Sequence, residues 1–178
     1  MVSGNTDRTA LAGSPRAQIY EGRIRQACPA DRTWLIPLSV RLHEFSRQAW
    51  RFPDSIDRAV ALSLERALSE PSADAEIQVA EDARQEPLGF VSLQTATDFT
   101  GEMHAYISDL VVRSTAEGRG VGAALLRQAE SWAVRRRHRL LALNVFTGNH
   151  RARELYERMG FLSDTIRMVK ELRSLGTL

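Results

Sequence analysis

The sequence predicts an α/β (α+β) protein whose mixed sheet is covered by helices. The hydrophobic period switches repeatedly between two and about 3.6 residues, which gives the element order β-α-α-β-β-β-α-β-α-β. Three consecutive strands followed by a β-α-β unit place parallel neighbours in a sheet that also has antiparallel ones. No internal repeat interrupts this order. We therefore expect one domain over residues 18–178, behind a flexible N-terminal tail at residues 1–17.

Composition bounds the class of protein. Hydrophobic residues make up 43% of the chain and charged residues 26%, as in soluble globular proteins. The 24 basic residues nearly balance the 22 acidic ones, which argues against a nucleic-acid partner. No apolar run is long enough to span a membrane, and the first residues lack the apolar core of a signal peptide, so we expect a cytoplasmic protein. With Cys28 as the single cysteine, neither a disulfide nor a metal site is expected.

The first third of the chain predicts a strand and two helices. Alternation over 18–26 indicates the strand. Asp31 is placed to cap the first helix, in which Pro37 predicts a kink or a later start. Its apolar side carries Trp34, Leu38, Leu42 and Phe45. A second helix begins at Ser55 and ends before Pro71. Its apolar residues in register are Ile56, Ala59, Val60, Leu64 and Ala67.

Three strands are expected next, because the period changes to two. The first surrounds Ile77 and Val79, and the second covers 88–93. The polar stretch 94–104 is interpreted as a connecting turn, and 106–112 as a more apolar strand.

The last third predicts two helices and two strands. A helix covers 121–136, and a nearly continuous apolar run over 140–145 indicates a strand that is buried on both faces. Asn149 can cap a final helix that Gly160 ends, and 165–172 closes the chain as a strand. The inner face of the first of these helices carries Val121, Leu125, Ala129 and Trp132.

The stretch 109–122 is typical of a phosphate-binding loop. An apolar strand ends at Val112, and Gly118, Gly120 and Gly122 then open a helix. Backbone N–H groups in such a turn, together with the positive end of the helix dipole, form a socket for a diphosphate. An ordinary tight turn is the alternative interpretation. The spacing fits neither a Rossmann fingerprint, which needs an acidic residue about 20 positions on, nor a Walker loop, which needs Lys-Ser/Thr.

A second motif runs from Asn149 to Phe161. Asn149 and Tyr156 are seven residues apart, so they lie on nearly the same face of a helix. Helical side chains lean toward the N-terminus, which brings the Tyr156 hydroxyl toward Asn149. The two residues could share a site, or could serve only as an N-cap and a core residue.

Together the two motifs resemble the GNAT superfamily of acetyl-CoA-dependent N-acetyltransferases over about residues 105–161. The matching segments are Leu110-Val111-Val112, Arg119-Gly120-Val121-Gly122-Ala123, Asn149 with Ala152, and Leu155-Tyr156-Glu157-Arg158-Met159-Gly160-Phe161. The segment 166–170 is also similar to the last strand of that family. One departure is Glu117, which stands where the family's loop usually begins with Arg or Gln.

The resemblance implies a mostly antiparallel sheet with splayed strands and acetyl-CoA as acyl donor. Backbone groups of Leu110, Val111 and Val112 would bind the pantetheine arm. The glycine loop would hold the diphosphate through Glu117, Gly118, Arg119, Gly120, Val121, Gly122 and Ala123. Asn149 and Arg153 would lie beside the donor. Tyr156 matches the family's usual general acid, which protonates the leaving thiolate.

The resemblance does not identify the general base. Asp109 is the first candidate, because an acid inside an apolar strand needs a reason, although it could be a structural hydrogen-bonding residue. Glu102, His104, the neutral Ser108 and a water relay are the alternatives. Strand alternation would place Asp109 and Ser108 on opposite faces unless a bulge resets it.

The predicted function is transfer of an acetyl group from acetyl-CoA to a primary amine on a small molecule or peptide. A CoA-binding sensor without catalysis and a toxin that acetylates aminoacyl-tRNA are the alternatives. A homodimer is compatible with exposed strand edges. The acceptor, and any use of longer acyl groups, are not specified by the sequence.

Overall fold

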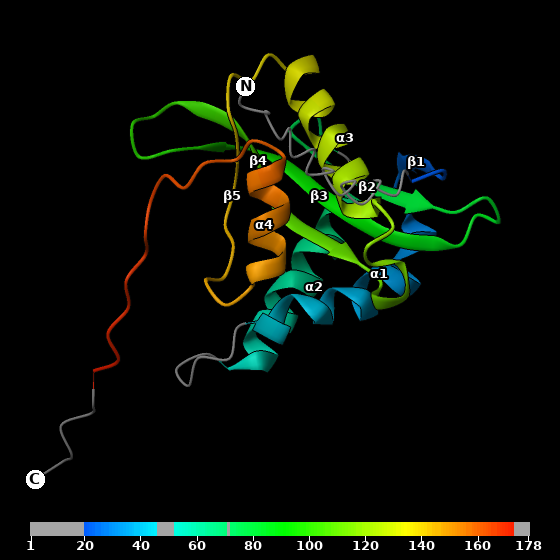
Figure 1. Cartoon of the computed structure of the whole chain (residues 1–178), viewed down its shortest axis with the longest axis horizontal. Helices are drawn as coiled ribbons and strands as arrows, with labels where there is room; N and C mark the ends of the chain where they lie inside the picture. The colour runs from blue at the N-terminus through cyan, green and yellow to red at the C-terminus, as the bar shows by residue number, and fades with distance from the viewer. Residues whose placement is uncertain (1–19, 46–51, 71, 173–178) are drawn as a thin grey trace, which may run out of the picture.

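The computed structural model describes residues 20–45, 52–70 and 72–172. Its sheet has the order β1-β2-β3-β4-β5, antiparallel except for the parallel pair β4–β5. This is the mixed, mostly antiparallel sheet that the sequence predicts, and helices lie on both of its faces (Figure 1). The strands are β1 (Arg23–Gln26), β2 (Ala75–Glu81), β3 (Pro87–Thr97), β4 (Met103–Val112) and β5 (Leu141–Leu143). The expected tail at residues 1–17 lies outside the described residues.

Within the described residues, four α-helices and three short 3₁₀ helices accompany the strands. The α-helices are α1 (Arg32–Ser39), α2 (Pro53–Ser69), α3 (Val121–Arg135) and α4 (His150–Arg158). The 3₁₀ helices are η1 (Pro29–Asp31), η2 (Val40–Phe45) and η3 (Ser114–Ala116). None of the helices in the described part of the chain has the length and apolar character needed to cross a membrane.

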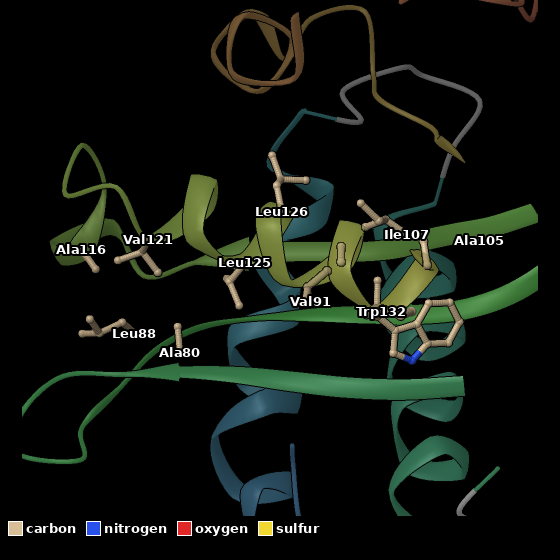
Figure 2. Packing of buried hydrophobic residues seen from close by; sticks show 13 residues of the cluster. Ala80, Leu88, Val91, Ala105, Ile107, Ala116, Val121, Leu125, Leu126 and Trp132 are labelled. Carbon is tan, nitrogen blue, oxygen red and sulfur yellow. The ribbon is translucent and has the colours of Figure 1, made fainter. Parts of the chain in front are cut away.

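Each face of the sheet has its own hydrophobic core. Figure 2 shows α3 lying along the strands, with Val121, Leu125 and Trp132 among the side chains between helix and sheet. All three are fully buried or nearly so, as the predicted inner face of this helix requires. On the opposite face, α1 and α2 pack over a second cluster. That cluster comprises Leu35, Leu64, Leu68, Ile77, Val79, Phe90 and Val111.

A β-bulge in β4 changes which core each residue serves. Ser92 pairs with Asp109, but the next residue of β3, Leu93, pairs with Ile107, so Ser108 is the extra residue. Before the bulge, Ile107 packs in the α3-side core; after it, Val111 packs in the α1/α2-side core. Simple alternation would have kept the two on one face. Asp109, two residues before Val111, therefore turns toward the α1/α2 face.

The strands β4 and β5 separate soon after they pair. Ala105, Tyr106 and Ile107 pair with Leu141–Leu143, and no described strand pairs with this edge of β4 from Ser108 to Val112. The predicted strand over 140–145 is therefore too long. The bulge redirects the β4 backbone where the ladder ends, so the two strands diverge.

Two other boundaries differ from the predictions. The stretch 94–104 is not a connecting turn, because β3 continues to Thr97 and β4 begins at Met103. Only a tight turn at residues 98–102 joins them, held by the Asp98 carboxylate, which accepts from the amides of Thr100 and Glu102. Polar residues suit these strand ends because the hairpin extends beyond the helices. The second helix begins at Pro53 rather than Ser55, since Pro fits the first helical turn.

The first helix keeps Pro37 inside it, and the backbone changes to 3₁₀ geometry immediately afterwards, at Val40. Asp31 occupies the N-cap position, but its side chain makes no cap to α1. Instead its carboxylate accepts two hydrogen bonds from Arg25, at 2.7 and 2.8 Å, and one from the Trp34 indole. The hydrogen bonds with Arg25 hold the pKa of Asp31 far below its usual range, despite partial burial. Asp31 therefore ties β1 to the start of α1.

The predicted closing strand at 165–172 does not form. Residues 161–172 have no regular structure and lead away from α4 (Figure 1). The large apolar side chains of this segment are exposed, with Ile166 at 85% and Met168 at 90%. A strand forms only when a neighbour supplies hydrogen bonds, and an alternating pattern does not provide that neighbour.

The close approach of β3 and β4 at Gly89 can be tested by substitution. A Cβ built at this position lies 2.4 Å from the Val111 carbonyl oxygen, which is rigid backbone. Gly89→Ala should therefore lower the free energy of unfolding by about 1–3 kcal/mol through forced strand separation. Gly148→Ala is the matched control, because a Cβ there meets open space. Urea unfolding measures both, and equal stability of the two variants would contradict the predicted contact.

Candidate active site

The glycine loop between β4 and α3 leaves backbone amides free. Gly118 and Gly120 have φ values of 74° and 79°, in the left-handed region that favours glycine. Gly120 is the N-cap of α3, so the first intrahelical bond runs from the Ala124 amide to the Gly120 carbonyl, 3.0 Å away. The amides of residues 121–123 thus have no partner within the helix. They stand at the positive end of a helix dipole, where an anion is stabilised.

Buried side chains on both sides fix the position of the loop. Ala116 and Val121 are each 1% exposed and anchor the turn in the α3-side core. A Cβ at Gly122 would lie 3.1 Å from Leu155 of α4, so glycine lets α3 approach α4 closely. A Cβ added at Gly118 would meet nothing within 4 Å, and Arg119 is exposed. The loop is therefore anchored in the core on one side and open to solvent at Gly118 and Arg119.

The open edge of β4 leads directly to this loop. The Arg113 amide donates to the Leu88 carbonyl of the neighbouring strand β3, 2.8 Å away. Alternation therefore turns the backbone groups of Val111 toward β3 as well. Those of Leu110 and Val112 point to the opposite, open edge. Of the three predicted pantetheine contacts, only Leu110 and Val112 therefore offer backbone groups; Val111 instead buries its side chain at 4% exposure.

One side chain already contacts this edge. Arg41 of η2 donates from Nη1 to the Val112 carbonyl oxygen, and from Nη2 to Glu117 Oε1 at 2.8 Å. Glu117 Oε2 accepts from Arg151 of α4. Partial burial opposes ionisation of Glu117, but the two arginines hold its pKa below the usual value. Arg41, Glu117 and Arg151 are called the arginine–glutamate bridge below.

The first turn of α4 is organised as the sequence predicts. The Asn149 side chain accepts a hydrogen bond from the Ala152 amide at 3.1 Å, which confirms Asn149 as the N-cap. Arg153 is partly buried and lies 3.9 Å from the Glu157 carboxylate, a weak pair within the helix. Gly160, with φ of 89°, follows the helix end.

Tyr156 packs on the α3 side of the molecule. Its ring contacts the α3-side core and meets Phe161 edge-on, with centroids 5.7 Å apart. Burial raises the pKa of Tyr156 to about 12, so the phenol is protonated at every physiological pH. A protonated hydroxyl can donate a proton or a hydrogen bond.

Asp109 is a buried carboxyl group at the point of divergence. It is 8% exposed, and burial raises its pKa to about 6, with the Ser108 hydroxyl opposing the rise only in part. At pH 7 such a group is mostly ionised, yet basic enough to accept a proton. It has the properties of a general base.

Two of the other predicted base candidates, Glu102 and His104, lie near the opposite end of β4 from the glycine loop. Glu102 forms a two-contact ion pair with Arg139, both at 3.0 Å, at the hairpin end. His104 packs edge-on against Tyr106, with centroids 6.3 Å apart. At about 3.3 Å per strand residue, Glu102 is roughly 20 Å from Asp109. Ser108 donates its hydroxyl to the Ser92 carbonyl at 3.3 Å and stabilises the bulge.

Three residues beside the site were not predicted. Tyr106 lies near Asp109 and hydrogen-bonds the Asn144 side chain; burial and the Asp109 charge raise its pKa. Arg41 reaches the glycine loop from a helix 76 positions earlier in the sequence. A polar Tyr and Asn at the ends of apolar strands were a usable signal. Nothing in the local sequence marks Arg41.

The free amides of α3, the open β4 edge and the uncrowded Gly118 fit a phosphorylated thioester such as acetyl-CoA. Across the described residues, no three His, Cys, Asp or Glu side chains gather as a metal site.

The buried Asp109 predicts a pH-dependent stability. Its folded pKa of about 6 exceeds the ordinary 3.8, so the folded chain binds more protons between these values. Ionised Asp109 therefore destabilises the fold above pH 6, by about 2–3 kcal/mol, and this penalty fades as pH falls toward 4. The Tm of Asp109→Asn minus that of the wild type should be larger at pH 7.5 than at pH 4.5.

Thermal unfolding by circular dichroism measures this difference, with Asp74→Asn as the exposed control. Any cost of the new amide is the same at both pH values, so it cancels in the comparison. A difference that does not change with pH would mean that Asp109 titrates normally.

Comparison with known proteins gives one consistent result. The sequence profile of the acetyltransferase (GNAT) family matches residues 40–161. An uncharacterized N-acetyltransferase, YhfO, from Bacillus subtilis (strain 168) is 32% identical over 143 residues, which cover 80% of this chain and 91% of that protein.

Solved structures agree in fold. A putative acetyl transferase from Pyrococcus furiosus is 26% identical with a TM-score of 0.67, over 85% of this chain and all of that one. A GCN5-related N-acetyltransferase from Ralstonia eutropha JMP134 has a TM-score of 0.68 at 22% identity, over 85% and 98% of the two chains. The glycine loop, the open strand edge and the relatives lead to one assignment: the chain belongs to the GNAT acetyltransferase family.

Proposed function

We propose that this protein transfers an acetyl group from acetyl-CoA to a primary amine of a small molecule or peptide. The observation that carries the proposal is the open edge of β4, which runs from the strand divergence to the free amides of α3, in a chain of this family. Cytoplasmic location and a homodimer stay predictions.

The donor would lie along this edge. Leu110 and Val112 would pair with the amide groups of the pantetheine arm as a neighbouring strand does. The amides of residues 118–123 would bind the diphosphate, with Asn149 and Arg153 beside it. Acetyl-CoA supplies an activated thioester carbonyl and a thiol leaving group.

Two side chains have the properties that the transfer needs. Asp109, ionised and buried, would take a proton from the amine nitrogen as the C–N bond forms. Tyr156, protonated and partly buried, would give a proton to the sulfur as the C–S bond breaks. The two protons balance, so the reaction needs no further reactant. A water between Asp109 and the amine remains compatible with the burial of Asp109.

The function is tested with the full chain in two steps. Calorimetry with coenzyme A should give binding, and acetyl-CoA with a panel of amines and N-terminal peptides should release thiol, with the acetylated product identified by mass spectrometry. Binding without thiol release for any amine would favour a CoA sensor. Absence of coenzyme A binding would overturn the proposal.

Tyr156→Phe should lower kcat by about 10²–10⁴-fold, the usual contribution of a positioned acid, with little change in the Kd of coenzyme A. The aromatic ring and its contact with Phe161 are retained, so the Tm should stay close to that of the wild type. A thiol-release assay measures kcat, and calorimetry measures the Kd of coenzyme A. Unchanged kcat with a good acceptor would remove Tyr156 from the acid role.

A further inference from the structure

The arginine–glutamate bridge is the feature of the donor site that neither the strand nor the glycine loop explains. It joins three elements around the loop: η2 through Arg41, the loop itself through Glu117, and α4 through Arg151. Arg41 and Glu117 are partly shielded, with side chains 25% and 29% exposed, and Arg151 is 62% exposed. Such placement makes the bridge stronger than an isolated surface pair while leaving it open to exchange.

The two guanidinium groups are held beside the amides that attract an anion. Glu117 immediately precedes Gly118, so its carboxylate brings both cations to the mouth of the loop. A carboxylate carries one negative charge, whereas a diphosphate diester carries about two and offers more acceptor oxygens. Guanidinium groups bind phosphates well because their planar N–H groups match two oxygens at once.

Arg41 also closes the edge that the donor would use. Its Nη1 donates to the Val112 carbonyl, one of the outward-facing backbone groups of β4. A ligand that pairs with this edge must first displace Arg41. The same side chain therefore links occupation of the strand edge to the charge at the loop.

We propose that Glu117 is an internal stand-in for the diphosphate of the donor, and that the arginine–glutamate bridge selects donors that carry one. An arriving diphosphate takes Arg41 and Arg151 from Glu117, and Arg41 leaves the Val112 carbonyl in the same exchange. A thioester without a diphosphate has nothing to offer the arginines and meets a closed edge. This inference rests on the proposed use of acetyl-CoA and adds a means of donor discrimination to it.

The direction in which Glu117→Gln changes the affinity for coenzyme A tests the exchange. Glu117→Gln removes the charge that competes at the loop, leaves the Arg41–Glu44 pair in place and keeps the side-chain shape, so coenzyme A should bind about threefold to tenfold more tightly. Glu154→Gln makes the same charge change at an exposed position of α4 and should leave the Kd unchanged. Calorimetry at fixed salt measures all three proteins. Weaker or equal binding by Glu117→Gln would overturn the proposal, because Glu117 would then orient the loop rather than compete.

A second comparison separates the two roles of Arg41. Arg41→Met removes a diphosphate partner and also frees the Val112 carbonyl. Coenzyme A should bind more weakly, by about threefold to tenfold, whereas pantetheine, which lacks the diphosphate, should bind more tightly. NMR titration detects the weak pantetheine complex, and thermal unfolding checks that the variant folds. Weaker binding of both coenzyme A and pantetheine would contradict the closure of the β4 edge by Arg41.

The outcomes also distinguish this inference from the proposed function. Coenzyme A binding by the wild type with no gain in Glu117→Gln leaves the function intact and overturns the exchange. Binding by Glu117→Gln but not by the wild type would mean that the donor never displaces Glu117, which overturns both the exchange and the proposed function. Binding by neither protein overturns both.

Discussion

The divergence of β4 from β5 is the constraint on which the rest of the site depends. The ladder between them covers only Ala105–Ile107, and the bulge at Ser108 turns the following residues. Unpaired backbone groups are normally a liability at a strand edge, since they invite pairing with another chain. Here one of them, the Val112 carbonyl, already accepts from Arg41 of η2, and the edge ends at the loop that opens α3, so an extended ligand could satisfy them. In the proposed function, the open edge would serve as a template for an extended, amide-bearing donor.

The two ends of the site use electrostatics in opposite ways. At the divergence, burial raises the pKa values of Asp109 and Tyr156, which favours proton transfer and keeps nearby charge low. At the glycine loop, Arg41, Glu117 and Arg151 are kept charged and close to solvent. A long substrate with a neutral reactive end and an anionic end matches this polarity along the strand. In the proposed function, this polarity would orient the donor before any specific contact to the acceptor is made.

The sequence predicts well where local signals decide the structure. The glycine loop, the inner face of α3 and the Asn149 cap depend on residues within one or two helical turns, and all are confirmed. The length of β5 and the expected strand at 165–172 depend on partners distant in the sequence, which periodicity does not reveal. The site follows the same rule. The burial of Asp109 could be anticipated because an acid in an apolar strand is unusual, whereas Arg41 reaches Val112 only through the tertiary fold.

The bulge at Ser108 has a consequence for how this chain can change length during evolution. The bulge absorbs one extra residue, so Asp109 to Val112 keep the faces that a regular ladder one residue shorter would give them. Loss of Ser108 would leave Asp109 facing α1/α2 and Leu110 facing α3, but it would remove the bulge at the point where β4 and β5 diverge. A change of length in the turn at 98–102 would alter only the hairpin tip. Insertions and deletions among relatives should therefore gather at that turn and avoid the bulge, whatever amine each relative acetylates.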